Sequence, residues 1–256
     1  MEQWLLFAGA AAFCLFILMA WLLRSARWAS YVSFTGCVLI IAALLLRWYD
    51  AGRPPWATLY ETSAMLALVT GLASAYSYRR RETPALYLPL AAVTVLLLVF
   101  SAVSWESNPA LSPELNSGWL LIHVPVVVLS YGMFTVAFAA SVAYIAFRIK
   151  KKGDDRTLER LDHISYTFIA AGLVLLVLGV IMGAIWAKAA WGAYWTWDPK
   201  ETWSLITAVI YAIYLIARKA GMKGEDAAFV SILGFIAVLF TYFGVSYLIP
   251  GLHSYR

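Results

Sequence analysis

The amino-acid sequence predicts an all-α, polytopic transmembrane bundle of about eight membrane-spanning helices. Hydrophobic residues make up 63% of the 256 positions, only 13% are charged, and the mean hydropathy is +0.78. A chain with so few charges could not present a polar surface in water. Runs of the roughly 20 apolar residues needed to cross a bilayer recur along the chain. They lie near 4–23, 28–46, 56–78, 84–103, 119–147, 164–187, 199–217 and 227–249.

The basic residues predict how these helices are oriented. Fourteen of the nineteen Lys and Arg fall in alternate connections, within 24–27, 79–81, 148–160 and 218–223. Positive charge accumulates on the cytoplasmic side of a membrane, so these connections are predicted to be cytoplasmic and both chain ends extracytoplasmic. Such short clusters between apolar runs orient helices and do not form a nucleic-acid-binding surface. No nucleic acid is therefore expected as a partner.

The connections between the apolar runs are too short for a separate soluble domain, so residues 1–256 are predicted to form a single integral membrane domain. The chain opens Met-Glu-Gln without a basic region, which predicts a retained first helix and not a cleaved signal peptide. Cys14 and Cys37 stand alone within apolar runs and are predicted to be small core residues.

The most distinctive segment is 186–203, which reads W-A-K-A-A-W-G-A-Y-W-T-W-D-P-K-E-T-W and holds five of the twelve Trp. Trp and Tyr concentrate at membrane interfaces in general. This density goes beyond an ordinary aromatic belt and predicts an extracytoplasmic loop that packs against a flat ligand. The segment from Asp198 to Glu201 predicts the start of a helix. Asp198 would be the N-cap, Pro199 the first helical residue, and Glu201 the third helical residue, which completes a capping box.

The histidines add a second observation. His123 lies about one turn inside the fifth apolar run, and His253 follows the last run, so both are predicted to lie on the same outer face as the Trp-rich segment. His163 lies at the opposite end and is predicted to be a capping or surface residue. Neutral imidazole is an axial ligand for haem iron, and porphyrin is a flat, apolar ring with two anionic propionates.

Haem therefore fits the outer face better than zinc, which requires three or four close ligands. In this interpretation aromatic side chains pack on the ring and basic side chains pair with the propionates. The ring-packing candidates are Trp191, Tyr194, Trp195, Trp197 and Trp203. The propionate candidates are Lys188, Lys200, Arg47 and Arg53, and for the two Lys the alternative is an interface anchor.

Glu61 is the acidic residue of the segment Leu59-Tyr-Glu-Thr62, near the outer start of the third apolar run. A carboxylate so close to the membrane is costly, which favours a functional role. Stabilisation of the helix N-terminus is an equal alternative.

Several motifs together resemble the CcsA/ResC family of system II cytochrome c biogenesis. They are W-G-A-Y-W-T-W-D-P-K-E-T-W-S-L-I from Trp191, L-L-I-H-V around His123, S-Y-G-M-F from Ser130, G-L-H-S-Y around His253, and L-Y-E-T from Leu59. The resemblance covers nearly the whole chain. It implies a protein of the plasma or a thylakoid-type membrane, with its active face extracytoplasmic.

The resemblance also implies an activity. Together with a ResB-type partner, such a protein moves haem b outward and presents it to apocytochrome c, whose C-x-x-C-H thiols are kept reduced by thiol-reducing proteins. His123 and His253 correspond to the outer axial ligands that flank the Trp-rich segment, and Asp198 and Glu61 are further candidates for haem contact.

One position departs from the family pattern. Family members have a His in the helix after the Trp-rich motif, where it serves an inner haem site, and this chain has Ile216. Three hypotheses follow. The first is a haem-handling subunit of a cytochrome c synthase, and the second is a non-enzymatic haem chaperone or fixed subunit of a larger membrane complex. The third is a transporter of another hydrophobic molecule, with Asp198 and Glu201 as working acids.

Overall fold

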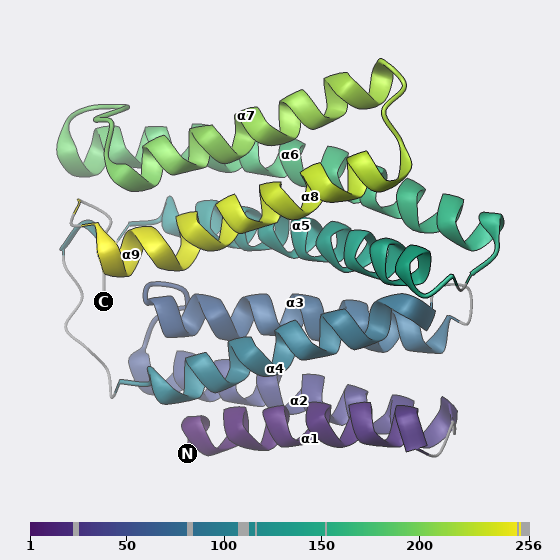
Figure 1. Ribbon diagram of the computed structural model, residues 1–256. Helices are drawn as coiled ribbons and strands as arrows, with labels where there is room; N and C mark the ends of the chain where they lie inside the picture. The colour runs from purple at the N-terminus through teal and green to yellow at the C-terminus, as the bar shows by residue number, and fades with distance from the viewer. Residues whose placement is uncertain are drawn as a thin grey trace. The chain divides into compact units, whose positions relative to one another are not determined.

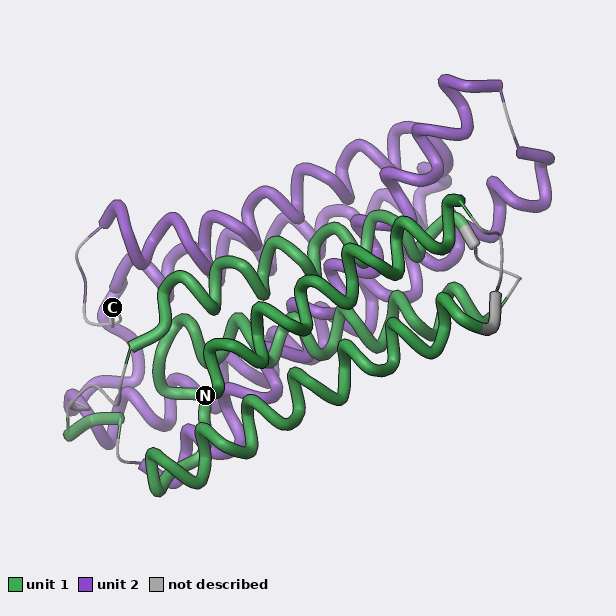
Figure 2. The backbone as a smooth tube through the Cα atoms, turned by 90° about the horizontal axis from the view of Figure 1, so that it is seen from below, with its two compact units in different colours: residues 1–116 green, residues 117–256 purple. Residues whose placement is uncertain are grey.

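The computed structural model describes residues 1–22, 26–80, 84–106, 113–115, 117–151, 153–249 and 251, and these contain helices and connections but no strand. The predicted all-α class is confirmed (Figure 1). Contacts divide the chain into two compact units, which we call unit 1 (residues 1–116) and unit 2 (residues 117–256) (Figure 2).

The described residues of unit 1 form four long helices. Each packs against two others, because α1 contacts α2 and α4, and α3 contacts the same two helices. The unit is therefore a closed four-helix arrangement. Its elements are α1 (Glu2–Leu22), α2 (Ala26–Ala51), α3 (Leu59–Arg79), the 3-10 turn η1 (Pro84–Leu86), α4 (Tyr87–Val103) and the 3-10 turn η2 (Pro113–Leu115).

Unit 2 contains the Trp-rich segment. In it α5 packs on α6 and α8, and α7 packs on the same pair. Its elements are α5 (Leu120–Ile149), α6 (Asp155–Trp191), α7 (Pro199–Lys219), α8 (Gly224–Leu239), a π-helical turn η3 (Phe240–Gly244) and α9 (Val245–Leu248). The α6–α7 connection and α9 lie at one end of this unit, here called the loop end (Figure 1).

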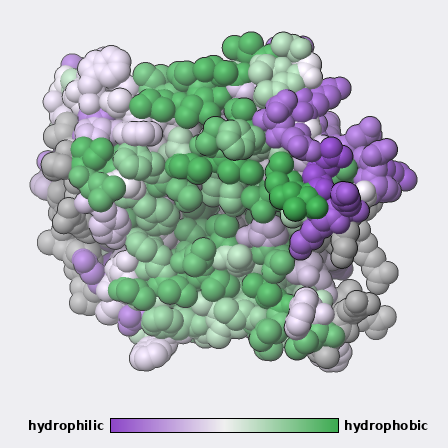
Figure 3. Space-filling view, viewed as in Figure 1, coloured by the Kyte–Doolittle hydropathy of each residue, from purple (hydrophilic) through white to green (hydrophobic). Residues whose placement is uncertain are grey.

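Membrane insertion follows from the length and composition of the helices. Among the described residues, six helical segments are long and apolar enough to cross a bilayer, and α4 is apolar but shorter. The protein is therefore an integral membrane protein. On the face seen in Figure 3, apolar residues cover the middle of unit 2, and strongly hydrophilic residues gather at the end opposite the loop end. The count of eight spans and the sides of the termini stay predictions.

Helix α6 is longer than its apolar run. It begins at Asp155, although the hydropathy pattern begins at residue 164, and its 37 residues extend about 55 Å at 1.5 Å per residue. Asp154 caps it by accepting a hydrogen bond from the Thr157 N–H at 3.0 Å. Most of the stretch 148–163 between the predicted apolar runs is thus helix, because hydropathy detects only the part of a helix that crosses the bilayer.

Small residues let α5 and α6 approach closely. A Cβ on Gly172 would lie 2.7 Å from the Phe134 ring, and one on Gly179 would lie 2.6 Å from Val127. Association of membrane helices depends on such van der Waals contact, because lipid is as apolar as the side chains. The same side of α6 contacts the candidate site.

At the opposite end of unit 2, an ion pair joins the helices. Arg218 of α7 makes two hydrogen bonds of 2.7 Å to the Asp162 carboxylate of α6. The same carboxylate accepts from the Gly224 N–H at 3.1 Å, where α8 begins. One acidic side chain thus joins three helices, and neighbouring His163 is exposed, as predicted.

Candidate functional site

The Trp-rich segment is helical at both ends. Trp186 and Trp191 belong to α6, which ends at Gly192 in a left-handed conformation (φ 82°). Glycine tolerates this conformation without a steric cost. Helix α7 begins at Pro199, so the predicted loop 186–203 is shortened to residues 192–198.

A capping box fixes this short loop. Asp198 accepts from the Lys200 N–H at 2.9 Å, as the predicted N-cap. The Glu201 carboxylate accepts from the backbone N–H groups of Thr196 at 2.8 Å and Asp198 at 3.2 Å. Trp197 lies between these two donors at φ 59°, a conformation that costs a bulky residue about 1–3 kcal/mol. The capping residues therefore hold an aromatic loop in a backbone shape that it would not adopt alone.

Replacement of Glu201 by Ala is expected to release this loop. The substitution removes the acceptor for the Thr196 and Asp198 N–H groups, at a cost of about 0.5–2 kcal/mol for a helix cap. Hydrogen exchange at those two amides should accelerate. Glu201→Gln keeps one acceptor oxygen, which suffices for a capping box, and should retain most of the protection. Equal exchange in wild type and Glu201→Ala would contradict this account.

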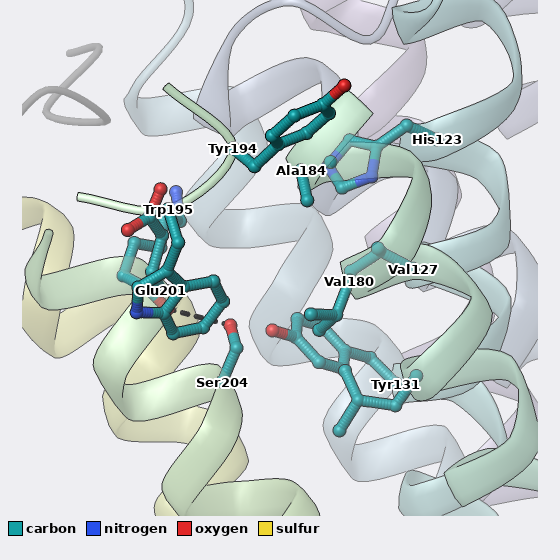
Figure 4. A pocket seen from close by; sticks show the side chains of 12 residues that line it. His123, Val127, Tyr131, Val180, Ala184, Tyr194, Trp195, Glu201 and Ser204 are labelled. Carbon is teal, nitrogen blue, oxygen red and sulfur yellow. Dashed lines mark hydrogen bonds between the residues drawn. The ribbon is translucent and has the colours of Figure 1, made fainter. Parts of the chain in front are cut away.

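A pocket of about 590 Å³ lies at the loop end of unit 2, between α5, α6, the loop and α7 (Figure 4). This volume includes space that is open to solvent at the pocket mouth. His123 and Tyr194 lie at one end of the pocket, and Tyr131 and Ser204 lie at the other. The lining consists of His123, Val127, Tyr131, Leu176, Val180, Gly183, Ala184, Tyr194, Trp195, Lys200, Glu201 and Ser204.

The orientation of His123 is set by α6. Its Nδ1 lies 2.8 Å from the carbonyl oxygen of Gly179. Because a carbonyl only accepts, Nδ1 carries the proton in neutral His123, and the lone pair is on Nε2. The buried Trp186 ring is nearly parallel to the imidazole, with the centroids 6.5 Å apart. His123 is therefore a half-buried imidazole that presents a metal-ligating nitrogen in a defined tautomer.

Three further predicted residues line the same pocket. Tyr194 is 59% exposed at its mouth, and Trp195 comes from the loop. Lys200, in the first turn of α7, donates a hydrogen bond to the Ser246 hydroxyl at 3.4 Å. The pocket thus brings together an imidazole, two aromatic rings and one cation from three separate parts of the chain.

The other predicted aromatic residues pack around the pocket and do not line it. Trp191 meets Trp186 edge-on at 4.7 Å between centroids. Trp203 lies 4.3 Å from the ring of Phe240. Trp197 is 68% exposed and meets Trp195 edge-on at 5.7 Å. These residues support the pocket walls or extend the exposed aromatic surface of the loop.

Lys188 also lies outside the pocket lining. Its Nζ donates to the Gly192 carbonyl at 2.7 Å and lies 5.6 Å from the Tyr194 ring centroid. The ammonium thus caps the end of α6, where a cation is favoured by the helix dipole. Asp198 is 6% exposed, and its role is the N-cap described above.

His253 lies outside the described residues. The described part of the C-terminal segment includes Gly251, where an added Cβ would clash with the Asp198 carboxylate and lie 3.0 Å from Pro199. Gly251 therefore lies directly against the start of α7, at the loop end of unit 2.

Glu61 belongs to an ion-pair network in unit 1. It is fully buried, and its carboxylate accepts from Arg47 Nε at 2.8 Å and from both terminal nitrogens of Arg53 at 3.0 Å. The N–H groups of Ala57 and Thr58 add bonds of 2.9 and 3.1 Å. Glu61 thus completes the capping box at the start of α3, and both arginines form ion pairs with it.

The network extends to the first helix. Arg47 Nη1 lies 3.4 Å from Glu2, and Glu2 accepts from the indole N–H of Trp105 at 2.6 Å. Arg47 and Glu2 are 3% and 5% exposed. Helices α1, α2 and α3 and the segment that follows α4 are thus joined at one end of unit 1 by charge-assisted bonds.

Sequence reasoning did not identify the polar end of the pocket, the glycine beside His123 or the aliphatic residues of the lining. Tyr131 and Ser204 form its polar end, and Gly183 contacts the His123 ring. A signal was present for Tyr131, because it lies eight residues after His123 and so shares its helix face. Ser204 and Gly183 carry no comparable signal.

Comparisons with known proteins agree with this picture. Residues 56–253 match the family model described as "Cytochrome C assembly protein". The chain is 36% identical over 230 residues to the cytochrome c biogenesis protein CcsA of Chlamydomonas reinhardtii, covering 85% of this chain and 65% of that protein. It is 36% identical over 250 residues to CcsA of Guillardia theta, covering 86% and 82%. It is 32% identical to CcsA of Prochlorococcus marinus (strain NATL2A), covering 96% and 93%.

A solved structure shares the fold. The cytochrome c haem lyase CcmF superposes with a TM-score of 0.70 at 20% identity, over 94% of this chain and 45% of that chain. At this identity the likeness concerns the fold alone. The family match and the relatives show that the chain belongs to the cytochrome c assembly protein family, as a membrane protein of the CcsA type.

Proposed function

We propose that this chain is the haem-handling subunit of a cytochrome c synthase and holds haem b at its extracytoplasmic face for attachment to apocytochrome c. The observation that carries the proposal is the pocket in unit 2. It gathers His123, Tyr194, Trp195 and Lys200, four residues that sequence reasoning assigned to haem.

The lining suits the three chemical features of haem. Val127, Leu176, Val180 and Ala184 provide apolar surface for the ring, and Trp195 and Tyr194 add aromatic faces. The Nε2 of His123 offers a lone pair for iron. Lys200 supplies a cation for a propionate.

A second axial ligand would come from the C-terminal segment. Gly251 contacts the start of α7, and two residues span at most about 7 Å. We therefore propose His253 for this role. The histidine of the apocytochrome motif has to displace one of the two imidazoles before the product leaves.

The chemistry asks little of the chain beyond position. In each attachment the thiol sulfur bonds to one vinyl carbon, the vinyl double bond becomes single, and the thiol proton ends on the other carbon, so the addition is redox-neutral. Holding the haem vinyl group beside the incoming thiol makes this step effectively intramolecular. In this proposal His123 and the aromatic side chains of Tyr194 and Trp195 hold the haem in position. The apocytochrome peptide approaches from the pocket mouth at Tyr194.

The proposed partners are apocytochrome c, a ResB-type membrane protein and proteins that keep the apocytochrome thiols reduced. The proposed location is the plasma or a thylakoid-type membrane. The positive charge of the connections 148–160 and 218–223, at the end opposite the pocket, supports an extracytoplasmic pocket.

Haem titration of the detergent-purified protein tests the proposal. We expect saturable binding of one haem per chain with a Soret band of a histidine-ligated iron. In cells, deletion should abolish covalent haem in exported c-type cytochromes. Absence of saturable binding would refute the haem site, and normal cytochromes in the deletion strain would refute the synthase role.

One observation favours a second candidate, a non-enzymatic haem chaperone. Ile216 replaces the family's inner histidine, and its side chain is 68% exposed on the outer surface of unit 2. This chain therefore has no imidazole at that point for an inner haem site. Haem binding without any loss of covalent attachment in the deletion strain would favour the chaperone.

A further inference from the structure

Gly183 of α6 makes contact with the proposed iron ligand. A Cβ at this position would lie 2.8 Å from Cε1 of His123, closer than real Cβ contacts come, and 3.3 Å from Nδ1. Any side chain here would force the imidazole to move. The ring therefore occupies the space that a side chain at residue 183 would otherwise fill.

The absence of a side chain at Gly183 also leaves the Gly179 carbonyl accessible to the His123 ring. In an α-helix the carbonyl of residue i points toward residue i+4, and Gly183 is residue i+4 from Gly179. Without a Cβ at 183, the imidazole reaches the Gly179 oxygen at 2.8 Å. A carbonyl oxygen has two lone pairs, so it accepts this bond in addition to its helix bond.

Two separate contacts from α6 thus define the position and the tautomer of the His123 ring. The space at Gly183 fixes where the imidazole lies, and the Gly179 carbonyl fixes which nitrogen carries the proton. Partners of this kind orient metal-ligating histidines and raise their basicity.

We infer that Gly183 and the Gly179 carbonyl are positioning elements for iron ligation, which hold His123 as the Nδ1–H tautomer with Nε2 toward the pocket. This inference rests on the proposed function for its consequence, but the tautomer itself is a property of the protein without haem.

The first test uses ¹⁵N-histidine NMR of the full chain without haem. The chain has three histidines, so His163→Ala and His253→Ala variants assign the His123 signals. We expect a protonated Nδ1 and an unprotonated Nε2 at a pH where the ring is neutral. A protonated Nε2 with a bare Nδ1 would overturn the inference, whether or not the protein binds haem.

The second test compares two glycines of α6. Gly183→Ala should shift the ring, break the bond to Gly179 and weaken haem binding by about 10–100-fold, the usual effect of losing an outer-shell partner. The Soret and visible bands should also change, and added imidazole should restore them.

Gly172→Ala is the matched control, because its Cβ would meet the Phe134 ring at 2.7 Å, an equally tight contact without a histidine. This variant should keep the wild-type haem spectrum. Equal loss of haem in both variants would overturn the inference by showing a packing effect only. If Gly183→Ala does not fold, the NMR test on the wild type decides alone.

Discussion

Replacing Glu61 with Gln is expected to cause a large loss of stability. The change keeps the size of the side chain but removes the charge that faces Arg47 and Arg53 in a fully buried position. Removing one partner of a buried ion pair costs about 3–5 kcal/mol, because the opposite charge stays buried without compensation. Thermal unfolding of the purified protein in detergent measures the effect.

The matched control is the exposed pair of Arg148 and Glu225. Its N···O distance of 2.7 Å is as short as that of the buried pair, but both side chains are more than half exposed. Surface pairs contribute about 0–1 kcal/mol, so Glu225→Gln should change the unfolding temperature little. Similar shifts in the two variants would show that burial of the Glu61 network does not determine its strength.

The second large effect is expected for His123→Ala. The substitution removes the only imidazole in the pocket lining among the described residues, and with it the proposed iron ligand. Haem affinity should fall by at least the 10–100-fold that loss of an outer-shell partner costs. Titration of the purified variant with haem, followed at the Soret band, measures the change.

His163→Ala serves as the control, because His163 is exposed on α6 at the opposite end of unit 2. It should bind haem as the wild type does. A His123→Gly variant leaves room for added imidazole, which should restore the low-spin spectrum. Unchanged haem binding by His123→Ala would show that His123 is not an iron ligand, and it would contradict the assignment of this pocket as the haem site.

The sequence alone determined the class of the protein and its local structure. Hydropathy and charge identified a helical membrane protein, because crossing a bilayer requires long apolar helices whatever their partners are. The capping box at Asp198 and Glu201 was also predictable, since its bonds join residues three positions apart. The Trp-rich motif and its neighbouring motifs in the sequence are sufficient to indicate the cytochrome c assembly protein family.

Tertiary structure decided which of these residues meet. Only part of the aromatic segment lines the pocket: Trp195 and Tyr194 do, whereas Trp191 and Trp203 pack on other rings. The pairing of Glu61 with Arg47 and Arg53, and the bond from His123 to Gly179, join residues on different elements. In helices that are apolar on nearly every side, sequence periodicity does not tell which face meets a neighbour. The face that meets a neighbouring helix is selected by close packing against glycine and by buried ion pairs. Both depend on residues far apart in the chain.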